Sequence, residues 1–110
     1  MPNLHRGEIE AEIGGARRRL VLTLGALAEL EAAFGADDLV ALAERFGRGR
    51  LSARDLVRII GAGLRGAGEA VTDEEVARME VAGGAAGYVR IAAALVAATF
   101  GAEEEGANPP

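Results

Sequence analysis

Cysteine, lysine, tryptophan and glutamine are all missing from this 110-residue chain, and serine, histidine and tyrosine occur once each. Without cysteine there is no disulfide, zinc–thiolate site or thiol nucleophile, and without lysine there is no Schiff base or P-loop phosphate contact. His5 alone forms neither a metal cluster nor a catalytic triad, and Ser52 is better explained as a helix cap than as a nucleophile. We therefore expect a protein that is not an enzyme and has no catalytic residues, metal site, cofactor or small-molecule substrate.

Basic charge is also scarce, because 12 arginines stand against 17 acidic residues and the formal net charge is −5. Three of the acidic residues are Glu103, Glu104 and Glu105, so the preceding part of the chain is nearly balanced. This charge argues against a protein that lives on nucleic acid or anionic lipid. The longest apolar run, residues 91–101, is shorter than a bilayer span, and the N-terminal residues do not resemble a secretory signal. We expect a soluble, cytoplasmic protein that does not enter a membrane.

Residues 8–13 alternate acidic and apolar side chains, and the turn-forming pair Gly14-Gly15 follows them. This pattern predicts a β-hairpin over about residues 8–22. Arg18 falls on the apolar face of this hairpin, where its long stem can carry the guanidinium out to water. A two-stranded hairpin is marginally stable alone, so it must pack against helices or pair with another chain. The expected pairs are Ile13 with Ala16, Glu12 with Arg17, Ala11 with Arg18, Glu10 with Arg19 and Ile9 with Leu20.

Between about residues 24 and 100, apolar residues recur at helical spacing and predict four to five short helices. The expected caps are Thr23, Asp37 or Asp38, Ser52 and Thr72, and glycines are expected to end the first four helices. The expected buried residues are Leu24, Leu27, Leu30 and Phe34; Leu39, Leu42 and Phe46; Leu56, Ile59, Ile60 and Leu64; and Val76, Met79 and Val81.

The last helix is expected at about residues 88–100, with Arg90 as its single charge and apolar residues on every side. A helix of this kind is either a central core helix or one that also docks a partner. The whole pattern predicts an α+β, mainly α fold, in which a two-stranded hairpin precedes the helices. We expect one small domain over residues 1–101 and a disordered acidic tail over residues 102–110.

Two motifs suggest nucleotide or nucleic-acid binding. Gly61, Gly63 and Gly66 fit the dinucleotide-binding pattern Gly-x-Gly-x-x-Gly, but no parallel sheet surrounds them, so we interpret them as small residues that allow close helix packing. Arg54, Arg58 and Arg65 are predicted to lie along one helix face, preceded by Arg48 and Arg50. The face fits a helix-turn-helix DNA-binding protein, although the acidic total favours a solvated face or an acidic protein partner.

Several short motifs, taken in order, resemble a known family. They are Asn3-Leu-His-Arg-Gly-Glu8, Leu24-Gly-Ala-Leu-Ala-Glu-Leu-Glu31 followed by Phe34-Gly35, Gly63-Leu-Arg-Gly-Ala-Gly68, and a closing Ala-rich helix that ends at Phe100-Gly101. The chain resembles the small tail proteins of the phage-like gene transfer agents of alphaproteobacteria, which are grouped with tail assembly chaperones and also described as tail tube proteins. The matching motif positions are Arg6, Gly7 and Glu8, Glu29 and Glu31, and Gly63, Arg65, Gly66 and Gly68.

The resemblance implies a tail assembly chaperone, whose partners would be the tape-measure protein and the major tail tube protein. A structural component of the tail is the second hypothesis, and a small DNA-binding regulator is the third. The sequence does not decide the oligomeric state, so both a monomer and a homo-oligomer stay open at this point. The candidate partner-binding residues are Arg6, Gly7, Glu8, Arg54, Arg58 and Arg65.

Overall fold

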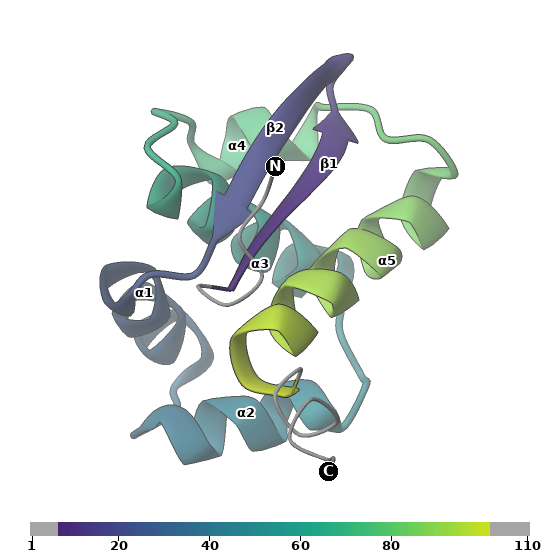
Figure 1. Cartoon of the computed structure of the whole chain (residues 1–110). Coiled ribbons are helices and arrows are strands. Elements are labelled where there is room, and N and C mark those ends of the chain that lie inside the picture. The colour runs from purple at the N-terminus through teal and green to yellow at the C-terminus, as the bar shows by residue number, and fades with distance from the viewer. Residues whose placement is uncertain (1–6, 102–110) are drawn as a thin grey trace, which may run out of the picture.

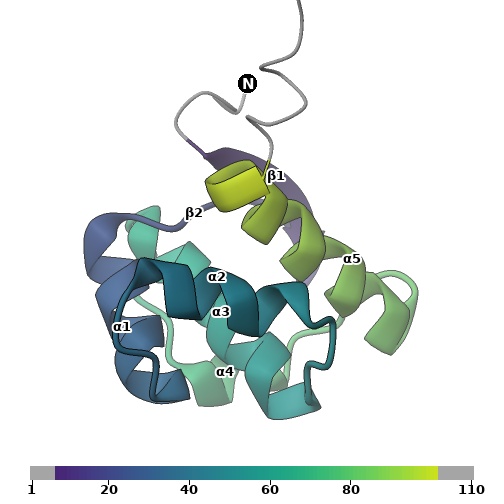
Figure 2. The same ribbon diagram turned by 90° about the horizontal axis from the view of Figure 1, so that it is seen from below.

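The computed structural model describes residues 7–101 and confirms the predicted α+β, mainly α fold. A two-stranded hairpin forms one layer and the helices form the other, with α5 along the flank of the hairpin (Figures 1 and 2). The elements in chain order are β1 (Glu8–Ile13), β2 (Ala16–Val21), α1 (Leu24–Phe34), α2 (Leu39–Gly47), α3 (Ala53–Gly66), α4 (Asp73–Ala77), α5 (Gly84–Val96) and the π-helical end η2 (Ala97–Gly101).

The register of the hairpin is the predicted one at all five expected pairs, and Glu8–Val21 extends it by a sixth. The ion pair on its polar face is diagonal, because Arg17 Nε lies 3.0 Å from Glu10 Oε1 rather than pairing with Glu12. Arg18 does not extend into water as predicted. Its Nε donates to the carbonyl of Ile13 at 2.7 Å, and its Nη1 pairs with Glu69, so it ties the hairpin to the chain after α3.

The predicted helix caps are confirmed. The side chains of Thr23 and Asp38 accept hydrogen bonds from the third backbone N–H of the following helix, at 3.1 and 2.8 Å. Ser52 and Thr72 do the same and are each answered by an acidic side chain at N3, which completes two capping boxes. These contacts join residues three apart, so each helix start is encoded locally.

Four helix predictions need correction. Leu24 is 77% exposed and Leu39 is 39% exposed; each is the first residue of its helix, and the buried residues of α1 and α2 begin further along, at Ala26 and Leu42. The helix α4 stops at Ala77, so Met79 and Val81 lie beyond it, although both still pack against the core. The last helix begins at Gly84 instead of residue 88, whereas α2 ends at Gly47 as predicted.

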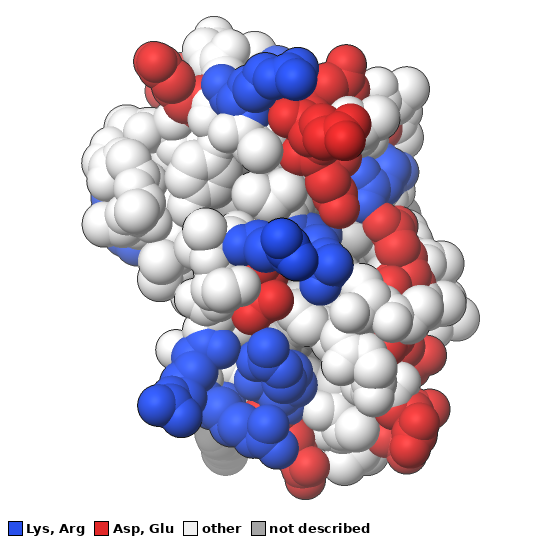
Figure 3. All heavy atoms as spheres, turned by 180° about the vertical axis from the view of Figure 1, so that it is seen from behind, with Lys and Arg blue, Asp and Glu red and all other residues white. Residues whose placement is uncertain are grey.

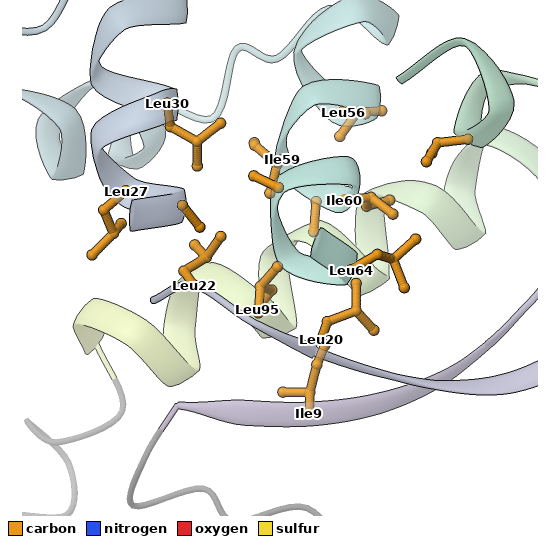
Figure 4. Close-up of a cluster of buried hydrophobic side chains, with 14 of the residues drawn as sticks. Ile9, Leu20, Leu22, Leu27, Leu30, Leu56, Ile59, Ile60, Leu64 and Leu95 are labelled. Atoms are coloured by element: carbon orange, nitrogen blue, oxygen red, sulfur yellow. The ribbon is translucent and has the colours of Figure 1, made fainter. Parts of the chain in front are cut away.

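The core lies between the hairpin and α3 and is closed by α1 and α5. Figure 4 shows Ile9 and Leu20 of the hairpin directed at Leu64 of α3, with Leu95 of α5 beside them. Leu20, Leu64 and Leu95 have no exposed surface, and burial of such a side chain is worth about 1.5–3 kcal/mol. The hairpin is therefore held by packing against helices, as expected.

The three motif glycines lie inside α3, where they allow neighbours to approach closely. A Cβ on Gly63 would lie 2.6 Å from Leu95 Cδ2, and one on Gly66 would lie 2.1 Å from the carbonyl oxygen of Val21. A Cβ on Gly61 would lie 2.3 Å from Asp73 Oδ1. The packing interpretation is confirmed, and the dinucleotide motif fails because these glycines do not form a turn before a helix.

Two contacts join the hairpin to the C-terminal third of the chain. The backbone N–H of Gly14, in the hairpin turn, donates to the carbonyl of Glu80 at 2.8 Å. At the other end of the hairpin, buried Gly7 has a φ of 78°, and a Cβ there would lie 3.4 Å from the carbonyl oxygen of Ala98. One end of the hairpin is thus joined to the chain before α5, at Glu80, and the other end lies against η2, at Ala98.

Candidate partner-binding site

The candidate residues from the sequence do not gather at one place. Arg6 lies outside the described residues, and Gly7 and Glu8 begin the hairpin beside η2. The arginines of α3 lie in a different part of the structure, and their surroundings differ from one to the next. Partner binding by the start of the hairpin stays a prediction.

The guanidinium of Arg65 is held by ion pairs and a hydrogen bond within the protein. Its Nη1 lies 3.0 Å from Asp73 Oδ1 and 3.0 Å from the carbonyl oxygen of Val71, and its Nη2 pairs with Glu29 of α1. Burial acts to lower the pKa of Arg65, but the hydrogen bonds and charges of Glu29 and Asp73 outweigh it and raise that pKa. Two family motif positions, Glu29 and Arg65, are therefore in contact although 36 residues separate them. This ion pair joins α1 to α3.

Arg58 and Arg54 have fewer partners than Arg65. Arg58 Nη1 donates to the carbonyl of Ala33 near the C-terminal end of α1, at 3.4 Å. Arg54 is exposed, and within residues 7–101 its side chain makes no hydrogen bond or ion pair. The helix-turn-helix hypothesis thus loses Arg65 as a free basic group, whereas partner binding by Arg54 and Arg58 stays a prediction.

Basic side chains gather at one end of the molecule. Figure 3 shows them at the lower end of the rear face, where α2 and the chain leading to α3 lie in Figure 1. Arg45 reaches from α2 to Asp55 of α3, with Nη2 3.1 Å from Oδ2, while Arg48 and Arg50 are exposed. Burial acts to raise the pKa of Asp55, but the backbone N–H of Ser52 and the charge of Arg45 outweigh it and lower that pKa. This corner is therefore fixed by a buried carboxylate.

An apolar groove lies between the start of α3, α4 and the start of α5. Its volume is about 520 Å³, and sequence analysis did not find it because its walls come from three separated segments. Three charged residues line the groove: Arg54 from the start of α3, and Asp73 and Glu74 from the start of α4. The other lining residues are Ala53, Leu56, Val57, Ala77, Ala85 and Tyr88.

The polar atom of Tyr88 is directed into the protein rather than into the groove. Its hydroxyl donates towards the carbonyls of Val76, at 3.1 Å, and Met79. Burial, with a smaller contribution from Glu80, raises the pKa of Tyr88. The hydroxyl of Tyr88 is therefore engaged within the protein, and the polar side chains that line the groove are Arg54, Asp73 and Glu74.

The helix formed by α5 and η2 presents a second apolar surface. Gly87, Ala92 and Leu95 are buried, whereas Val89 is 48% exposed and Ala93 lies open on the outer side. Figure 3 shows few charged groups on the flank where α5 begins.

By length and composition alone, this helix could cross a membrane, with a mean hydropathy of 1.4 over 18 residues. The uncharged run of residues 91–101 is the second part of this longer helix, which begins at Gly84 and contains the exposed Arg90. Only 17% of the 18 residues are buried in the structure. The exposed side of this helix consists mainly of alanines and Val89, whereas Tyr88, Ile91 and Phe100 pack partly against the core.

A comparison with known families identifies the chain as a phage-type tail protein. Residues 6–102 match the family described as phage tail tube protein, GTA-gp10, and the chain belongs to that family. The resemblance seen in the sequence motifs is thereby confirmed at the level of the gene-transfer-agent tail protein family. No curated protein and no solved structure matches the chain.

Proposed function

We propose that the protein is a tail assembly chaperone that binds the tape-measure protein while the major tail tube protein assembles around it. It acts by binding, without catalysis, in the cytoplasm. The open apolar side of α5 and η2 carries this proposal, because a chaperone for an aggregation-prone helical protein needs an accessible apolar surface.

The small sheet also supports an assembly role. The described sheet has two strands, β1 and β2, and the rest of the described chain is mainly helical. A tube wall built from paired strands needs a larger sheet, because main-chain hydrogen bonds across strand edges hold such walls together. We therefore place the protein beside the tube rather than within its wall.

Co-expression with the tape-measure protein of the same gene cluster tests the proposal. Size-exclusion chromatography with light scattering should show a soluble complex of defined stoichiometry. Ala93→Glu and Val89→Glu, on the open side of α5, should reduce the yield of that complex, whereas Ala32→Glu on exposed α1 should not. A tape-measure protein that stays insoluble while this protein elutes alone would refute the proposal.

A structural tail component is the second candidate, and the family description as a tail tube protein favours it. In that case the hairpin edges would pair between copies to form rings or a tube. Quantitative mass spectrometry of purified particles separates the two candidates. Many copies per particle indicate a structural component, whereas absence from finished particles indicates a chaperone.

The cytoplasmic location can be tested independently, because the helix Gly84–Gly101 meets the length and composition expected of a membrane span. Fractionation of producing cells should recover the protein in the supernatant. Recovery in the membrane pellet, resistant to salt and carbonate, would contradict the proposed location.

A further inference from the structure

We propose that the groove between α3, α4 and α5 binds one amphipathic helix of a partner protein, in a fixed direction. The apolar side of that helix fills the groove, an acidic side chain meets Arg54, and a basic side chain meets Glu74. This inference rests on the proposed function, since the tape-measure protein is the partner in which we seek the helix.

Apart from the charged side chains of Arg54 and Glu74, the side chains that line the groove are apolar or already paired, and such a lining favours a helix. An extended peptide would need partners for its backbone N–H and C=O groups. Tyr88 directs its hydroxyl to backbone carbonyls, and Asp73 is paired with Arg65. The apolar lining of α3, α4 and α5 offers side-chain carbons instead. A helix satisfies its own backbone, so it can enter this surface without losing hydrogen bonds.

The charges at the two ends of the groove select the direction of that helix. Arg54 and Glu74 are both exposed, and in the described part of the chain neither side chain has an ion-pair or hydrogen-bond partner. The N-terminus of α3 adds positive partial charge at the Arg54 end. The C-terminal, electronegative end of an incoming helix therefore fits beside Arg54, and its N-terminal end fits beside Glu74.

The length of the groove follows from the position of α4 along α3. Asp73 Oδ1 approaches the backbone at Gly61, which is seven residues beyond Arg54 and so about 10 Å further along the helix axis. This length equals about two helical turns. The bound segment should carry apolar residues at i, i+3 or i+4, and i+7, a basic residue before them and an acidic residue after them.

Binding of overlapping 25-residue peptides covering the tape-measure protein tests the inference. Fluorescence anisotropy with the full chain should select peptides with this pattern, and circular dichroism should show that they gain helix on binding. Ala77→Glu places a charge on the exposed groove wall and should weaken binding at least about tenfold. The matched control Ala32→Glu, on α1, should bind like the wild type.

Charge reversal tests the direction. Arg54→Glu should weaken binding about two- to fivefold, as expected for an exposed ion pair. A peptide whose acidic residue is replaced by lysine should recover that loss with Arg54→Glu, but not with Glu74→Arg. Recovery with Glu74→Arg instead would overturn the proposed direction.

The outcomes separate this inference from the proposed function. A co-expressed complex that survives Ala77→Glu leaves the chaperone function standing and overturns the groove as its site. Failure of the wild type to form any complex overturns both. A wild-type dimer that Ala77→Glu dissociates would mean that a second copy fills the groove, which also overturns the inference.

Discussion

Replacement of Gly66 by alanine should push the hairpin away from α3. The new Cβ would lie 2.1 Å from the carbonyl oxygen of Val21, so β2 or α3 must move by about 1 Å to bring this contact beyond 3.0 Å. Overpacking of this kind costs about 1–3 kcal/mol. The gain in helix propensity on replacing glycine is at most about 1 kcal/mol, and it is small here because Gly66 ends the helix.

We therefore expect Gly66→Ala to lower the free energy of unfolding by about 1–2 kcal/mol and Tm by about 5–15 °C. Gly63→Ala should lower the free energy of unfolding less, because its new Cβ would meet side-chain atoms, Leu95 Cδ2 at 2.6 Å and Leu20 Cβ at 3.2 Å, instead of a backbone oxygen. Gly25→Ala is the matched control, since its nearest atom is Thr23 Oγ1 at 3.9 Å, and it should be as stable as the wild type or more so.

Urea unfolding followed by far-ultraviolet circular dichroism measures all three variants, and the lack of tryptophan is then no obstacle. The midpoints should fall in the order Gly25→Ala, Gly63→Ala, Gly66→Ala. Equal midpoints for Gly66→Ala and Gly25→Ala would show that α3 and β2 do not approach closely enough to require glycine.

Three further substitutions have defined outcomes. Asp55→Asn should cost about 1–2 kcal/mol in thermal unfolding at pH 7, because it removes charged hydrogen bonds to Ser52 and Arg45. Since the folded pKa of Asp55 is lowered, this contribution to the free energy of unfolding is present above about pH 3.8 and is lost as the pH falls through the folded pKa. Asp55→Asn should not show this part of the acid-dependent loss. Tyr88→Phe should cost about 1 kcal/mol at pH 7. The folded pKa of Tyr88 is raised, so its contribution to the free energy of unfolding is complete below pH 10.0 and is lost as the pH rises through the folded pKa. A series of Tm measurements up to about pH 11 tests this, and an equal alkaline loss of Tm in Tyr88→Phe and the wild type would contradict it. Leu95→Asp should unfold the domain, because it buries an unpaired charge, and a native circular dichroism spectrum at 25 °C would disprove the core position of this residue.

The features that the sequence predicts correctly depend on residues close together in the chain. The turn Gly14-Gly15 sets the hairpin register, because pairing outward from a two-residue loop leaves no freedom. The caps at Ser52 and Thr72 act over three residues. Local rules of this kind give most element boundaries. The end of α4 is an exception, because the helix stops at Ala77, just after the buried Val76, and the residues beyond it pack on the core without helical structure.

The features that the sequence does not predict depend on residues far apart in the chain. Leu24 continues an apolar stripe, yet it is 77% exposed because nothing within residues 7–101 covers it. The pairing of Glu29 with Arg65 cannot be found from helical spacing, and it takes Arg65 out of the predicted basic face. The groove is likewise invisible until α3, α4 and α5 are assembled.

The anchoring of the hairpin turn has a consequence for synthesis on the ribosome. The bond from Gly14 to the carbonyl of Glu80, and the approach of Gly7 to Ala98, need residues made near the end of translation. A nascent chain that lacks them can pack the hairpin against α3, but it leaves the Leu95 side of the core uncovered and both ends of the hairpin unanchored. The native domain must therefore close after most of the chain has left the exit tunnel, and truncations that remove α5 should yield an unfolded chain instead of a smaller folded unit.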